Sequence, residues 1–315
     1  MPLQTEARPK SFKQFLGNEE VVQALRTALE QENHNHCMLI SGQSGCGKTT
    51  LARVIARFLG AYNPKEMNNP GFREINASDF RGVDTVRMIR EEALRAPLGA
   101  PVRVFFCDEC HMLTRQAQEA FLKVLEEASG FNYFLFATTD PQMLSATFKR
   151  RVVHYALQPL STKRITELLE SVCSKYELQV DEQVIDKITS MSNGSPGIAV
   201  GFLDMARSVE DDDPANVIAV LERGQAQEAQ AIELCRLLVK RAPWKSVAAH
   251  LKKIKEQGED PEGLRRMVLG YCSSVLLGRD DPHSWVIMEA FMEPTYNTGF
   301  PGIVFAAYQA LAGQK

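Results

Sequence analysis

The segment at residues 42–49 constrains the fold more than any other part of the chain. Its letters, GQSGCGKT, fit the phosphate-binding pattern GxxxxGK[ST]. An apolar run at 37–40 precedes it and a helical pattern at 49–59 follows it, which is the order of strand, loop and helix that this pattern needs. Such a loop turns its backbone N–H groups toward phosphate, and the helix N-terminus favours negative charge. The residues expected to hold the phosphates of a nucleotide are Gly45, Cys46, Gly47, Lys48, Thr49 and Thr50.

A second motif ends the buried-strand pattern at 104–107 with two acids, Asp108 and Glu109. Acids often begin a loop after a strand, so the pair alone is moderate evidence. Roughly 60 residues after a phosphate-binding loop, it is typical of enzymes that hydrolyse phosphoanhydrides. We expect Thr49 and Asp108 to hold Mg²⁺, and Lys48 to pair with the β- and γ-phosphates of ATP. Glu109 is then expected to polarise the attacking water.

The charge balance excludes a strong overall field. The 36 basic and 39 acidic side chains leave a net charge of −3. Residues 1–207 carry 24 of each sign, and residues 208–315 carry 12 basic and 15 acidic side chains. Any contact with nucleic acid must therefore come from a local patch or from helix N-termini.

Seven scattered cysteines suit a reducing compartment, in which buried thiols behave as small apolar groups. Cys107, Cys110 and His111 lack a second cysteine pair at zinc-site spacing, so we expect no metal there. His34, His36, His111 and His154 show no metal-ligand spacing either, and we assign them to the surface or to packing. The first ten residues have no apolar region typical of a signal peptide, and no apolar run approaches the length of a membrane span. These features predict a cytoplasmic protein without a membrane segment.

Short apolar runs alternate with helical patterns through the first half of the chain. The predicted strands are 37–41, 72–75, 102–107, 133–138 and 152–155. The predicted helices between them are 19–32, 49–59, 84–96 and 115–128. This alternation predicts an α/β domain over residues 1–158, with a five-stranded parallel sheet covered by helices on both faces. The phosphate-binding loop is then expected at the carboxyl edge of the sheet.

After Pro159 the pattern is helical only. Helices are predicted at 162–176 and 181–191, and a third follows the turn at 193–197 and ends near 208. Together they give a small helical lid over 159–207. Residues 208–315 are predicted to form an all-α collar domain whose apolar residues make a helical bundle. Breaks between its helices are expected near 224, 257–258, 278–282 and 298–302.

With these motifs assembled, the chain resembles the AAA+ ATPases and, more narrowly, the subunits of sliding-clamp loaders. Arg8 and Pro9 begin the first of two segments, 8–12 and 15–18, that match a family motif which packs against adenine. Residues 74–79 and 81–84 look like the small subunits of replication factor C, whereas 123–127 and 137–142 look like the bacterial gamma/tau subunit. This blend suggests a phage or divergent bacterial loader.

The resemblance implies further residue roles. Thr138 would act as sensor 1, which hydrogen-bonds the γ-phosphate or the attacking water, with Thr139 as the alternative one residue on. Arg151 would reach the γ-phosphate of a neighbouring subunit in trans, with Arg150 as the fallback. Gly197 stands where the family's lid usually carries the sensor-2 arginine, and non-hydrolysing members share this glycine.

The segment that follows the second predicted strand contains four candidate residues, one for regulation and three for DNA binding. Asn76 either hydrogen-bonds Glu109 as a regulatory switch that waits for DNA, or is a turn asparagine. Three arginines either contact duplex phosphates without reading sequence, or lie on a solvated helix paired with Glu91 and Glu92. These arginines are Arg81, Arg87 and Arg90.

The function that the resemblance implies is ATP-driven loading of a ring-shaped sliding clamp onto primer–template DNA. The expected partners are other loader subunits in a pentameric assembly that includes copies of this chain, the clamp and DNA of any sequence. One alternative is a non-hydrolysing structural subunit, which Gly197 favours and the intact Lys48 and Glu109 oppose. Another is a different AAA+ machine, such as a helicase loader or branch-migration motor, against which the 8–10 and 76–79 segments argue.

Overall fold

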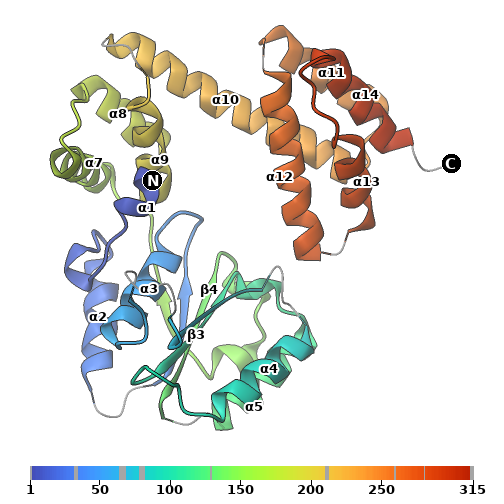
Figure 1. Cartoon of the computed structure of the whole chain (residues 1–315). Helices are drawn as coiled ribbons and strands as arrows, with labels where there is room; N and C mark the ends of the chain where they lie inside the picture. Colours follow the sequence, from blue (N-terminus) through green and yellow to red (C-terminus); the bar gives the residue numbers. More distant parts are fainter. Residues whose placement is uncertain are drawn as a thin grey trace. The chain divides into compact units, whose positions relative to one another are not determined.

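The structure is a computed structural model that describes residues 2–31, 35–63, 69–77, 82–127, 130–209, 213–258, 260–279 and 281–312. The chain divides into two units, Met1–Ile218 and Ala219–Lys315. Figure 1 shows a mixed α/β first unit, with its strands in one sheet, and a helical second unit. The finer division of the first unit near residue 158 stays a prediction.

Five parallel strands form one sheet in the first unit, in the order β2-β3-β4-β1-β5. The strands are β1 (Cys37–Ser41), β2 (Phe72–Asn76), β3 (Arg103–Asp108), β4 (Asn132–Thr138) and β5 (Val153–Ala156). The predicted sheet is thus confirmed, with strand ends that differ by one residue. Because β1 lies between β4 and β5, the loop that leaves β1 opens at the carboxyl edge beside the end of β4.

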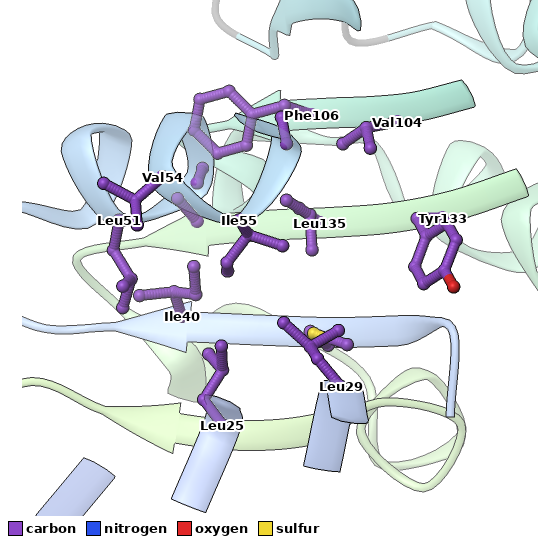
Figure 2. Close-up of a cluster of buried hydrophobic side chains, with 14 of the residues drawn as sticks. Leu25, Leu29, Ile40, Leu51, Val54, Ile55, Val104, Phe106, Tyr133 and Leu135 are labelled. Carbon is purple, nitrogen blue, oxygen red and sulfur yellow. The ribbon is translucent and has the colours of Figure 1, made fainter. Parts of the chain in front are cut away.

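Helices cover both faces of this sheet, as the almost continuous burial of β1, β3 and β4 requires. Ile40, Phe106 and Leu135 pack against α2 (Glu19–Glu30) and α3 (Lys48–Phe58) on one face, which Figure 2 shows. The alternate residues Leu39 and Phe105 belong to the core with α4 and α5 on the other face. These last two helices are α4 (Val83–Ala93) and α5 (Arg115–Glu127).

Three helices follow β5 within the first unit, as predicted. They are α7 (Thr162–Tyr176), α8 (Glu182–Met191) and α9 (Pro196–Ala206), which begin after the side-chain caps Ser161, Asp181 and Ser195. The short helix α1 (Leu3–Glu6) packs on α9, where Leu3 is fully buried and its N–H donates to Asp204 Oδ2 at 3.1 Å. The N-terminal segment therefore reaches the lid helices before it enters the sheet layer.

Five helices account for the second unit: α10 (Pro214–Val239), α11 (Trp244–Glu256), α12 (Pro261–Arg279), α13 (Pro282–Ala290) and α14 (Gly299–Ala312). The break predicted near Gly224 is wrong, because α10 runs through it. One glycine costs a helix about 1 kcal/mol relative to alanine, which burial of an apolar residue on either side outweighs. Leu221 and Leu234, on either side of Gly224, are both fully buried. The other three predicted breaks coincide with helix ends.

Candidate nucleotide-binding site

The loop between β1 and α3 has the curled backbone that its glycines permit. Gly45 and Gly47 have φ values of 76° and 97°, in the left-handed region that side chains disfavour. A Cβ on Gly45 would lie 2.1 Å from Ser195 Oγ, and one on Gly47 would lie 3.1 Å from the ring of Phe15. Glycine therefore lets both the start of α9 and the N-terminal segment approach the loop closely.

The first turn of α3 carries Lys48 and Thr49 into the site. Lys48 is only 6% exposed, and its Nζ donates to the carbonyl oxygens of Gly42 at 3.0 Å and Gln43 at 3.1 Å. Two of its three donors thus hold the ammonium over the loop. Thr50 follows in the same turn, where the helix N-terminus leaves backbone N–H groups without helical partners. This end of α3 suits an anion.

A hydroxyl and a carboxylate meet between α3 and β3. Thr49 Oγ1 donates to Asp108 Oδ2 at 2.8 Å, and Asp108 Oδ1 accepts from the backbone N–H of Glu109 at 2.9 Å. These are oxygen ligands of the kind that Mg²⁺ prefers, on two elements that approach the same point. The two residues predicted to hold Mg²⁺ are therefore brought together.

Glu109 leaves the end of β3 with a left-handed backbone, at φ 49°, which is unusual for a residue other than glycine. Its side chain is 36% exposed, and the carboxylate turns toward the end of β4. Thr139 Oγ1 donates to Glu109 Oε2 at 3.3 Å, and His111 Nδ1 lies 3.3 Å from the same oxygen. Glu109, the proposed general base, is thus held through one of its two carboxylate oxygens.

The two threonines proposed for sensor 1 occupy different surroundings. Thr138 is fully buried, and its hydroxyl oxygen accepts from the N–H of Asp140 at 3.0 Å and lies 3.1 Å from His111 Nδ1. Thr139 is exposed and contacts Glu109. The structure therefore places Thr139 on the open side of the site and Thr138 behind it.

The predicted switch and DNA residues lie at the β2 edge of the sheet and on α4. Asn76 ends β2 in register with Asp108, and its hydrogen bond to Glu109 stays a prediction. Arg81 lies outside the described residues. Arg87 pairs with Asp84 at 2.9 Å, and Arg90 pairs with Glu127 of α5 at 2.7 Å.

The ion pairs of Arg87 and Arg90 differ from those that the solvated-helix interpretation expects. Arg87 and Arg90 pair with Asp84 and Glu127 instead of Glu91 and Glu92, so that assignment is wrong. For Arg90 the reason is that α4 packs against α5, which brings Glu127 within reach, whereas Asp84 lies one turn before Arg87 on α4 itself. Glu92 lies 3.6 Å from Arg103. The side chains of Arg87 and Asp84 are 72% and 90% exposed, a setting in which ion pairs are weak.

Arg151 lies between the short helix α6 (Ala146–Lys149) and β5, the strand at one edge of the sheet. Its guanidinium forms an ion pair with Glu126 of α5, and both side chains are nearly half exposed. Arg150 is the C-cap of α6 and is exposed. An arginine at this edge is accessible to a neighbouring molecule once the pair with Glu126 separates.

The N-terminal motif packs against the loop and the chain that leads to the lid. Arg8 is exposed and Pro9 half-buried just after α1, and Phe15 lies against Gly47. Asn18 and Gln158 are joined by two hydrogen bonds: Asn18 Nδ2 donates to the Gln158 carbonyl at 3.0 Å, and the Gln158 N–H donates to Asn18 Oδ1 at 2.7 Å. The segment thus fixes the start of the chain that leads from β5 to α7.

At Gly197, helix α9 meets the loop through its backbone. The N–H of Gly197 donates to the carbonyl of Gly45 at 3.2 Å. A Cβ on Gly197 would lie 3.3 Å from the same carbonyl oxygen, closer than most side chains tolerate. The glycine therefore allows the N-terminus of α9 to rest directly on the loop.

The cysteines of this region are buried. Burial raises the pKa of both the Cys107 and Cys110 thiols, and it also raises the pKa of the Cys46 thiol, against the effect of Lys48. In the parts of the chain that the structure describes, no three His, Cys, Asp or Glu side chains are grouped to hold a metal ion. These thiols therefore pack as apolar groups.

One site residue was missed from the sequence. His111 was assigned to the surface or to packing, yet it lies between Glu109 and Thr138 in the turn η2 (Cys110–Met112). The available signal was its position two residues after Glu109, in the turn that follows β3 at the carboxyl edge of the sheet.

Comparison with known proteins finds similar sequences among proteins of DNA replication. The family described as DNA polymerase III, delta subunit, matches residues 17–161. The gamma/tau subunit of DNA polymerase III from Mycobacterium tuberculosis is 35% identical over 221 residues, 65% of this chain and 38% of that protein. The replication factor C small subunit of Methanococcus maripaludis is 31% identical over 207 residues, 65% of this chain and 64% of that protein. The chain thus spans less than two thirds of these relatives.

Solved structures resemble the fold. The RuvB Holliday junction branch migration motor of Thermotoga maritima superimposes with a TM-score of 0.57 over 78% of this chain and 85% of that one. The two sequences are 20% identical, so this similarity concerns the fold alone.

Proposed function

We propose that this chain, a member of the AAA+ clamp-loader family, uses ATP to load a ring-shaped sliding clamp onto primer–template DNA. One observation carries the proposal. The loop lysine, the Thr49–Asp108 pair and the Glu109–Thr139 pair, which come from separate segments, converge at one edge of the sheet. This is the set of groups that hydrolysis of a nucleoside triphosphate needs.

Each residue would have a distinct task. The backbone of 45–47 and the ammonium of Lys48 would hold the phosphates, while Thr49 and Asp108 would hold Mg²⁺. When bound, Mg²⁺ supplies positive charge that offsets the charge of the phosphates. Glu109 would accept a proton from the attacking water, and Thr139 would donate its hydroxyl toward the γ-phosphate or that water. We assign this last task to Thr139 because Thr138 is buried.

The remaining cationic partner would come from a neighbouring subunit. Gly197 supplies a backbone N–H and no charge, so the lid of this chain offers no arginine at that position. Arg151 at the β5 edge would fill the role in trans. The same Gly197 keeps the non-hydrolysing subunit open as an alternative, which the ATPase measurement below decides.

The partners follow from the same proposal. The chain would act in an assembly with further loader subunits, bind the clamp, and grip DNA through Arg81, Arg87 and Arg90 on or before α4. Exposed ion pairs such as Arg87–Asp84 cost little to exchange for phosphate contacts. No helix of the described residues has both the length and the apolar character needed to cross a membrane. We propose the cytoplasm as the site of action.

Two substitutions separate nucleotide binding from hydrolysis. Lys48→Ala should weaken the binding of a fluorescent ATP analogue by about 100-fold or more, because the phosphates lose a buried, charge-assisted partner. Glu109→Gln should leave this affinity unchanged within a few fold and abolish steady-state ATPase activity with primed DNA and clamp. Lys123→Ala, which removes an exposed lysine of α5, is the control and should behave as wild type. Equal ATPase rates in wild type and Glu109→Gln would reject the proposal.

A further inference from the structure

We propose that His111 is a positioning residue that fixes the orientation of Glu109, a role that rests on the ATPase function proposed above. His111 lies in the turn η2, and its side chain is 19% exposed. Its Nδ1 is 3.3 Å from Glu109 Oε2 and 3.1 Å from Thr138 Oγ1. A single ring nitrogen thus bridges the acid and the end of β4.

The chemistry of the two neighbours decides where the ring proton lies. A carboxylate accepts hydrogen bonds and cannot donate them, so a favourable contact with Glu109 requires a hydrogen on Nδ1 of His111. The neutral Nδ1–H tautomer and the imidazolium both provide it. The opposite tautomer would direct the lone pair of Nδ1 at the carboxylate oxygen. Nδ1 therefore carries a hydrogen, which is donated to Thr138 Oγ1 and lies beside Glu109 Oε2.

Thr138 supplies a rigid anchor for the ring. It is the last residue of β4, fully buried and paired in register with Ser41 of β1. Its hydroxyl oxygen also accepts from the N–H of Asp140 at 3.0 Å. The position of His111, and through it that of Glu109, is thus tied to the sheet.

The two carboxylate oxygens of Glu109 differ in their contacts. Both His111 and Thr139 contact Oε2, so within the described part of the chain Oε1 is the oxygen left to accept a proton from water. When Thr139 turns its hydroxyl toward a phosphate, it leaves Glu109. His111 is then the donor that keeps the carboxylate oriented. A base displaced by about 1 Å can lose about 100-fold in rate.

The test compares two substitutions at position 111 in the full chain. His111→Leu removes the donor at similar volume and should lower kcat for ATP hydrolysis by about 10- to 100-fold. KM for ATP and the affinity for a fluorescent ATP analogue should stay within about twofold, because the groups that hold the phosphates are unchanged. His111→Asn places an amide N–H where Nδ1 lies and should recover most of kcat.

A merely structural role predicts a different pattern. If His111→Leu kept the wild-type kcat, raised it, or lowered kcat and nucleotide affinity together, the inference would be overturned. Failure of His111→Asn to exceed His111→Leu would overturn it as well. Should His111→Leu not fold, His111→Gln replaces it, since its longer amide misses the Nδ1 position and should show the same loss of kcat.

Glu109→Gln distinguishes this inference from the proposed function. If wild type and His111→Leu were equally active and Glu109→Gln were inactive, only the role of His111 would be rejected. A wild type with no more activity than Glu109→Gln would remove both proposals.

Discussion

At the scale of single residues, the site is built from short polar contacts between segments far apart in the sequence. Thr49 meets Asp108 from 59 residues away, and Thr139 meets Glu109 from 30 residues away. The motifs predict which residues take part, because phosphate and Mg²⁺ binding restrict the residue types. They do not predict the role of His111, since its partners are determined by how β3 and β4 end beside each other.

Arg151 provides the prediction at this scale. Its present partner is Glu126, so Arg151→Ala should leave nucleotide binding intact in the isolated chain. In the assembled loader the same change should lower ATPase activity by at least about 100-fold, because arginines supplied in trans are worth about 10³- to 10⁵-fold. Mixing Arg151→Ala with Lys48→Ala subunits should restore part of the activity at mixed interfaces.

The matched control for this experiment is Arg150→Ala, which removes the adjacent charge. It should retain most of the activity. Full clamp- and DNA-stimulated activity in both variants would exclude a trans-acting arginine at this edge of the sheet. If only Arg150→Ala lost ATPase activity, the trans-acting role would be assigned to Arg150 instead of Arg151.

At the scale of helices and strands, the sequence predicts most of the first unit. Strands buried on both faces appear as continuous apolar runs, so their ends are predicted to within one residue. The prediction of a break at Gly224 is wrong because a glycine lowers helix stability only modestly. Burial of apolar residues elsewhere in α10 keeps the helix continuous. The contact of Gly197 with Gly45 was not predictable, because it depends on how α9 approaches the loop.

A buried ion pair joins α12 to the chain after α13 in the second unit. Glu262 accepts two hydrogen bonds from Arg265, at 2.6 and 2.9 Å, and two from the N–H and hydroxyl of Thr295. The Arg265 guanidinium, first among these donors, holds the pKa of Glu262 well below its usual range. Arg265 also donates to the carbonyl of Phe291 at 2.9 Å.

This pair predicts a pH-dependent stability of the second unit. Because the pKa of Glu262 is lowered on folding, its contribution is present above the ordinary glutamate value of about 4.3 and is lost as the pH falls below it. Glu262→Gln should therefore lower the urea midpoint clearly at pH 7. The gap between variant and wild type should narrow between about pH 5 and pH 3.

Tryptophan fluorescence measures this transition, since both tryptophans of the chain, Trp244 and Trp285, lie in the second unit. The control is Glu289→Gln, which changes an exposed carboxylate of α13 and should leave the midpoint unchanged. A gap that stayed constant from pH 7 to pH 3 would contradict the assigned role of Glu262.

At the scale of the whole molecule, the net charge of −3 excludes DNA binding through an overall positive field. Replacing Arg81 and Arg87 with alanine should weaken binding to primed DNA equally for all sequences. The salt dependence should flatten by about one log–log unit for each phosphate that the variant no longer neutralises. A double substitution of Arg115 and Lys123, exposed cations of α5, is the charge-matched control. Unchanged affinity and salt slope in the Arg81 and Arg87 variant would assign both to a solvated surface.

The most direct test of the central claim is clamp loading itself. The full chain, assembled with its partner subunits, is mixed with labelled clamp, primed circular DNA and ATP, and clamp retained on DNA is measured after gel filtration. Wild type should leave the clamp on the DNA only when ATP is present. Glu109→Gln should hold clamp and loader together without release, and Lys48→Ala should load none. Retention of clamp at the wild-type level without ATP, or with Lys48→Ala, would contradict the account.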